Sequence, residues 1–99
     1  MNIRTTTLAA TLAATLATTA VAQDCQQIGE LAESIMKARQ SGVAMREQYE
    51  LVDGFALGEF LIQRAYEEPR FSTDRHQQRV TRDFGDTWFL ACVQHTEGE

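Results

Sequence analysis

The stretch Phe55-Ala-Leu-Gly-Glu-Phe-Leu-Ile-Gln-Arg-Ala-Tyr66 is apolar on most sides when it is drawn as a helix. Leu57 and Leu61 lie four residues apart on one edge, which is a helical spacing. The alternation expected of a strand fails at residues 60–62, where three apolar side chains are consecutive. Pro69 then ends a helix, because its ring removes the backbone donor. The stretch therefore predicts the central and most buried helix of an all-α protein.

A first helix is predicted ahead of this stretch. Asp24 is a suitable N-cap, with Gln27 able to return the second bond of a capping box, and Gly42 ends the helix. Cys25 lies in its first turn. The apolar residues between these ends recur on one side and form a single stripe, made up of Ile28, Leu31, Ala32, Ile35, Met36 and Ala38.

A short second helix is indicated by Met45, Tyr49 and Val52, which recur at i, i+4 and i+7. Ala44 is a poor cap for it, because alanine has no side-chain oxygen to accept a backbone hydrogen bond. The dipeptide at residues 53–54, Asp-Gly, then interrupts the chain with a turn. We therefore expect the second and central helices to be joined by a tight connection.

A last helix is predicted after Ser72, which is a good N-cap. Its apolar, aromatic and histidine residues recur three or four positions apart, at His76, Val80, Phe84, Trp88, Ala91, Cys92 and His95.

Two glycines stand inside predicted helices. Gly58 costs about 1 kcal/mol relative to alanine and is expected where another helix approaches closely. Gly85 is expected to bend or split the last helix.

The first 22 residues resemble a cleavable signal peptide. Arg4 supplies one positive charge, residues 8–21 are rich in Ala, Leu and Thr, and Ala20-Val21-Ala22 offers small residues for a signal peptidase. The alternatives are a retained anchor or an organellar transit peptide, but threonines interrupt the apolar stretch that spanning requires. Lipid attachment at Cys25 is disfavoured by the larger residues before it. Cleavage predicts a periplasmic or secreted protein, with residues 23–99 forming a single domain.

Cys25 and Cys92 stand near the two ends of that domain. In an oxidising compartment such a pair most simply forms one disulfide, which is worth about 4 kcal/mol for a loop of this size. The alternative, a redox-active or metal-binding pair, lacks Cys-x-x-Cys spacing. A domain of this length has only a thin core without such a link. The predicted fold is a compact bundle of four to five short helices closed by one disulfide.

Charge argues against one class of partner. Without Arg4 the chain carries a net charge of −6, which argues against a nucleic acid as a ligand. The charge is unevenly spread, with five arginines in residues 64–82 and only acidic charges in residues 83–99. Arginine makes bidentate contacts, so the first of these regions could dock a carboxylate-bearing partner. The alternative is a solvated helix face with local ion pairs.

Three segments together resemble a group of short secreted proteins of bacteria and their prophages, whose activity is uncharacterised. The segments are residues 36–42 (Met-Lys-Ala-Arg-Gln-Ser-Gly), residues 65–70 (Ala-Tyr-Glu-Glu-Pro-Arg) and residues 84–92, which end in cysteine. The resemblance covers most of residues 23–99. It implies an exported helical protein with a terminal disulfide, and it brings no catalytic residues with it.

The residues that often carry catalysis are poorly placed here. Ser72, Asp74 and His76 are too close in sequence to build a triad around a substrate, and Ser72 is better used as a cap. His76 and His95 are too far apart along one helix to converge on a metal with Asp83 or Asp86. Glu67 and Glu68 are adjacent, so they diverge around a helix rather than forming a carboxylate pair. We expect no catalytic residues, no metal and no cofactor.

A candidate interaction surface combines residues at helix ends with aromatic residues of the last helix. Its members are Arg39, Gln40, Tyr66, Arg70, Phe71, Trp88 and Phe89. The alternative for the arginines is that they satisfy carbonyl groups at helix ends. The alternative for the aromatic residues is the core, although the last helix has more apolar surface than one stripe can bury.

These observations predict a non-catalytic periplasmic module that binds another periplasmic or envelope protein, as an inhibitor or accessory factor. No stable membrane anchor is expected after cleavage. The second hypothesis is an acid- or stress-related periplasmic chaperone, since protonation of carboxylates can expose apolar surface. The identity of the partner and the oligomeric state stay open.

Overall fold

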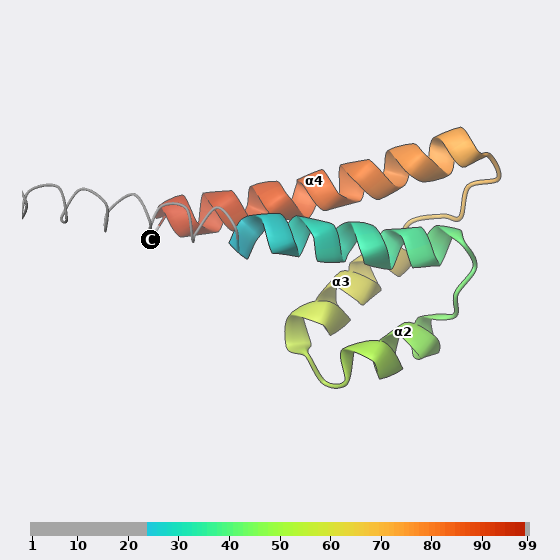
Figure 1. The fold of residues 1–99 in the computed structure, drawn as a ribbon, viewed down its shortest axis with the longest axis horizontal. Helices are drawn as coiled ribbons and strands as arrows, with labels where there is room; N and C mark the ends of the chain where they lie inside the picture. The colour runs from blue at the N-terminus through green and yellow to red at the C-terminus, as the bar shows by residue number, and fades with distance from the viewer. Residues whose placement is uncertain (1–23, 99) are drawn as a thin grey trace, which may run out of the picture.

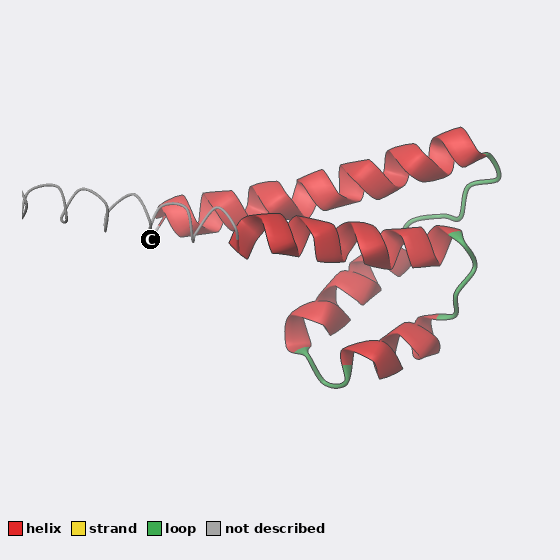
Figure 2. Cartoon of the chain, in the orientation of Figure 1, coloured by secondary structure: helices red, strands yellow, loops and turns green. Residues whose placement is uncertain are grey.

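The computed structural model describes residues 24–98, and these residues form four helices joined by short loops (Figure 2). The first helix covers residues 24–40 and is followed by α2 (Met45–Val52), α3 (Ala56–Tyr66) and α4 (Asp74–Gly98). Nothing in this described part is a strand. The predicted all-α class is therefore confirmed, with four helices. The predicted signal peptide lies outside the described residues.

The first helix and α4 lie side by side in opposite directions, and the hairpin of α2 and α3 packs beneath them (Figure 1). Cys25 of the first helix is bonded to Cys92 in α4. The Cα atoms of this pair are 5.5 Å apart although 67 positions separate them in sequence. The predicted disulfide is confirmed, and it joins the two longest helices of the described chain near one end.

The core lies where α3 packs against the first helix and α4. Leu61 and Ile62 of α3 and Met36 of the first helix are completely buried, and Phe84 of α4 closes the core from the other side. Burying side chains of this size stabilises the fold by about 1.5–3 kcal/mol each. The apolar run that predicted a central helix does provide its most buried positions. Its neighbour α2 contributes Met45, Tyr49 and Val52 at the edge.

Two glycines allow close helix packing. An added Cβ at Gly58 would lie 2.7 Å from Cγ1 of Val52, so α2 approaches α3 here as predicted. At Gly85 the predicted split is absent, because α4 continues through this residue without a break. An added Cβ there would lie 3.0 Å from the carbonyl oxygen of Gly29. The lack of a side chain at Gly85 therefore lets the first helix approach α4, and it does not split α4.

The helix ends correct two of the predicted caps. Asp24 is itself helical, so it is not the non-helical residue that an N-cap must be. At α4 the cap is Thr73 rather than Ser72, because the Thr73 hydroxyl oxygen accepts a hydrogen bond from the backbone N–H of His76 at 3.3 Å. The start of α2 agrees with the sequence, since Ala44 makes no side-chain cap. Asp53 and Gly54 form the predicted turn with φ of 46° and 81°.

Candidate interaction surfaces

Gln40 belongs to the interior and not to an exposed surface, as its side chain and backbone are only 2% exposed. Its Oε1 accepts a hydrogen bond from the Phe71 backbone N–H at 2.8 Å, and its Nε2 donates to the Pro69 carbonyl at 2.9 Å. In return, Nε of Arg70 donates to the Gln40 carbonyl at 2.9 Å. Gln40 therefore fastens the loop between α3 and α4 to the end of the first helix, and its place in the predicted surface is corrected.

Arg39 and Tyr66 extend the same contact. The guanidinium of Arg39 donates twice to the Glu68 carbonyl, at 3.2 and 3.3 Å, and its Cζ lies 4.9 Å from the centre of the Tyr66 ring. The Tyr66 hydroxyl donates to the Val43 carbonyl and accepts from Nε2 of Gln48 at 2.9 Å. The arginines thus satisfy backbone carbonyls, as the alternative interpretation stated. We call Arg39, Gln40, Tyr66, Arg70 and Phe71 the loop clamp.

The two aromatic residues of the predicted surface lie apart from the loop clamp. Trp88 is half-buried and packs edge-to-face against Phe60 of α3, with ring centres 5.0 Å apart, and against Phe84 at 6.2 Å. Phe89 lies on another side of α4, against Gly29, and is 36% exposed. Trp88 therefore belongs to the edge of the core, whereas Phe89 remains partly available at the surface.

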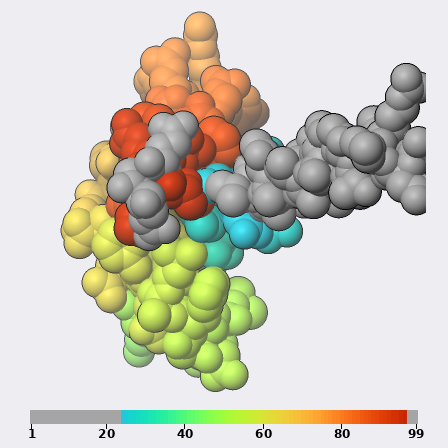
Figure 3. Space-filling view, turned by 90° about the vertical axis from the view of Figure 1, so that its left-hand side faces the viewer, coloured from blue at the N-terminus to red at the C-terminus, as the bar shows by residue number. Residues whose placement is uncertain are grey.

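The most exposed large apolar residues at the α2–α3 turn were not predicted as a surface. Leu51 is 83% exposed, Phe55 52% and Phe60 42%, and we call these three residues the apolar tip. Leu51 and Phe55 lie on either side of the turn at residues 53–54, at the end of the hairpin that Figure 3 shows protruding below the long helices. Phe60 lies further along α3, with one side of its ring against Trp88. The sequence did contain a signal for this surface. Around the turn it has more apolar residues than one buried side of each helix can accommodate.

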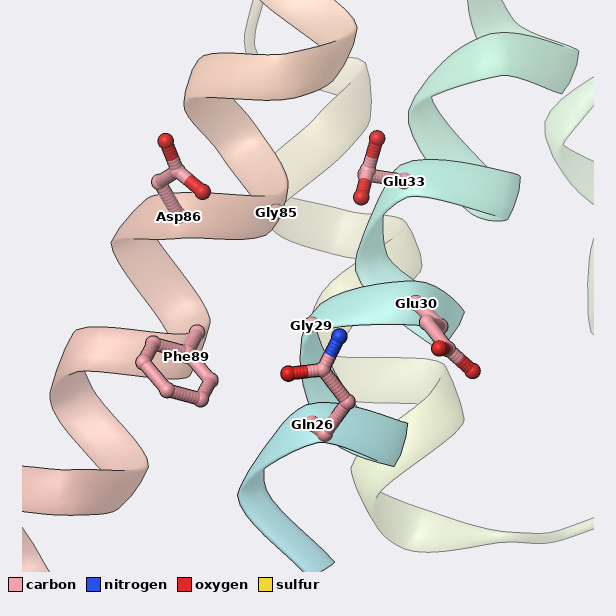
Figure 4. A pocket seen from close by; sticks show the side chains of 7 residues that line it. All are labelled: Gln26, Gly29, Glu30, Glu33, Gly85, Asp86 and Phe89. Atoms are coloured by element: carbon pink, nitrogen blue, oxygen red, sulfur yellow. The ribbon is translucent and has the colours of Figure 1, made fainter. Parts of the chain in front are cut away.

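Two adjoining clefts follow the line where the first helix meets α4. A cleft of about 150 Å³ surrounds Gly29 and Gly85, and a cleft of about 460 Å³ lies closer to the start of α4. Glu33 lines both of them. Figure 4 shows Glu33 on the first helix and Asp86 on α4, at the two sides of the smaller cleft. We call the two clefts together the seam groove.

The described residues do not gather three or more His, Cys, Asp or Glu side chains in a way that could hold a metal ion. Their helices are also too short or too polar to cross a membrane. His76, one of the triad-type residues, places its ring against Phe71 with ring centres 5.8 Å apart. Comparison of the chain with family models, curated proteins and solved structures finds no match.

Proposed function

We propose that this protein is a small exported module that binds another periplasmic or envelope protein through the apolar tip, and that it catalyses no reaction. The observation that carries the proposal is the exposure of Leu51, Phe55 and Phe60 within ten positions of one turn. Aromatic side chains of this kind are frequent anchors of protein interfaces, because they bury a large area at a small cost in side-chain entropy.

The tip is held by a well-packed hairpin. Val52 packs closely on Gly58, and Nε2 of Gln63 in α3 donates to the Tyr49 hydroxyl in α2 at 2.7 Å. Gln48 of α2 is 5% exposed and donates to the Ile35 carbonyl of the first helix at 3.1 Å. A binding surface on such a support loses little conformational freedom when its partner arrives. This geometry suits a dedicated partner better than a disordered client.

The proposed location follows from the disulfide. The bond between Cys25 and Cys92 is consistent with an oxidising compartment outside the cytoplasm. Together with the signal-like residues 1–22, it supports export to the periplasm or the medium. The resemblance to short secreted helical proteins of bacteria and prophages supports the same location. Periplasmic fractionation of the tagged protein, with detection of the processed form, tests this part of the proposal.

Site-specific photo-crosslinking tests the proposed binding surface. A photoreactive phenylalanine analogue replaces Phe55 in one variant and Gln94, an exposed residue of α4 that lies outside the seam groove, in a control. We expect one discrete adduct at Phe55 in intact cells, none at Gln94, and loss of the Phe55 adduct when Leu51→Ser is added. Equal adducts at both positions, or none at Phe55, would overturn the proposal. Many adducts that form only in acid would instead favour the chaperone hypothesis.

A further inference from the structure

The exposed charges along and beside the seam groove are unevenly distributed by sign, with acidic residues in excess near the disulfide and basic residues in excess near the start of α4. The half near the disulfide carries Glu30, Glu33 and Asp86 around the smaller cleft. The half near the start of α4 carries Lys37 and Arg82, which line the larger cleft together with Glu33 and Asp74. Arg75 and Arg79 line neither cleft, but they are exposed beside it on the side of α4 that Arg82 shares, because residues spaced three and four positions apart share one side of a helix.

These groups make no ion pair within the described chain. Glu30, Glu33 and Asp86 have no ion pair among residues 24–98, and neither do Lys37 and the three arginines of α4. Among residues 24–98 the structure shows an ion pair between Arg64 and Glu67 at 2.9 Å, and these two residues do not line the groove. The face therefore presents an acidic half beside a half with an excess of basic residues, with Phe89 partly exposed next to the acidic half.

We propose that this face binds a second copy of the chain in an antiparallel, two-fold symmetric dimer. A two-fold axis between the halves places the basic half of each copy against the acidic half of the other, so both contacts are complementary at once. The two halves are close enough on α4 for this arrangement, because Arg79 and Asp86 are seven residues apart, or about 10 Å along the helix. No residue of α2 or α3 lines the groove. The dimer therefore leaves both apolar tips free.

Exposed ion pairs contribute about 0–1 kcal/mol each, so this dimer is weak and sensitive to salt. Sedimentation equilibrium of the processed, oxidised protein measures it directly. We expect a dimer at low ionic strength, with a dissociation constant that rises about tenfold when salt screens the charges. A protein that stays monomeric at high micromolar concentration in low salt would overturn the proposal.

Two charge-reversal variants provide the decisive comparison. The first carries Arg75→Glu, Arg79→Glu and Arg82→Glu, and the second carries Glu30→Lys, Glu33→Lys and Asp86→Lys. Each is expected to be monomeric, because the two-fold arrangement then opposes like charges. An equimolar mixture is expected to form a one-to-one heterodimer, since one face is now acidic apart from Lys37 and the other is basic apart from Asp74. If both variants fold by circular dichroism and the mixture stays monomeric, the proposed geometry is wrong.

A control separates this geometry from general attraction between oppositely charged proteins. Glu47→Lys with Glu50→Lys changes exposed charges on α2, outside the groove. This variant is expected to dimerise like the unchanged protein and to form no heterodimer with the acidic variant.

The dimer does not depend on the proposed function. A monomer that still gives the Phe55 adduct would overturn the dimer alone, and a dimer without the adduct would overturn the function alone.

Discussion

Gly29 of the first helix and Gly85 of α4 face each other across the seam between these helices. A Cβ added to Gly85 would lie 3.0 Å from the Gly29 carbonyl oxygen, and one added to Gly29 would lie 3.4 Å from the Gly85 carbonyl oxygen. A Cβ at Gly85 would also meet the side chain of Glu33, which already occupies this space. The pair therefore sets how closely the two long helices approach, a short distance from the disulfide that joins them.

We expect Gly85→Ala to destabilise the protein although alanine favours helices. The gain in helix propensity is about 1 kcal/mol, whereas forcing a methyl group against the Gly29 backbone and the Glu33 side chain costs about 1–3 kcal/mol. Urea denaturation measures the net effect. Gly29→Ala is the matched comparison and should be milder, because its nearest contact would be the Phe89 Cβ at 3.3 Å. A Gly85→Ala protein that is more stable than the original would contradict this account.

Removing the disulfide should cost about 4 kcal/mol, the value expected for a loop of 67 residues in the chain-entropy model. The measurement compares the urea midpoint of the oxidised protein with that of Cys25→Ser combined with Cys92→Ser. This loss is a large fraction of the stability of a small domain. An unchanged midpoint would show that the helices hold together without the covalent link.

Gln40→Ala should destabilise the protein by about 1–3 kcal/mol, because it leaves the Phe71 N–H and the Pro69 carbonyl without their partner in a partly buried region. Gln78→Ala on the exposed part of α4 is the control and should change stability by less than about 0.5 kcal/mol. Thermal unfolding followed by circular dichroism gives both values. Equal, small effects of the two substitutions would remove the structural role assigned to the loop clamp.

Thr73→Ala should cost about 1 kcal/mol through loss of the hydrogen bond from His76 to the Thr73 hydroxyl at the start of α4. Ser72→Ala should be close to neutral, because Ser72 is exposed and does not cap the helix. Both variants are measured by urea denaturation under the same conditions. The opposite order would return the cap to Ser72, where the sequence placed it.

The fold was more predictable than the candidate site. The spacing of Leu57 and Leu61, and of Met45 with Tyr49, identified helices that the structure contains. The loop clamp shows where this reasoning fails. Gln40 and Arg70 were grouped as an exposed patch because they are polar and lie near helix ends, whereas tertiary contacts use them to hold a loop. Conversely, Phe55 was assigned to a buried run but is half exposed.

The sequence by itself determined the helices and the disulfide, because helical periodicity and a single pair of cysteines are local or countable properties. The tertiary structure alone decided which polar groups are buried, which apolar side chains stay exposed, and how charges are distributed over a face. These outcomes depend on neighbours far away in sequence, as Gly29 depends on Gly85 and Gln40 on Phe71. A periodic pattern states that a helix has an apolar side, but only packing determines what covers that side.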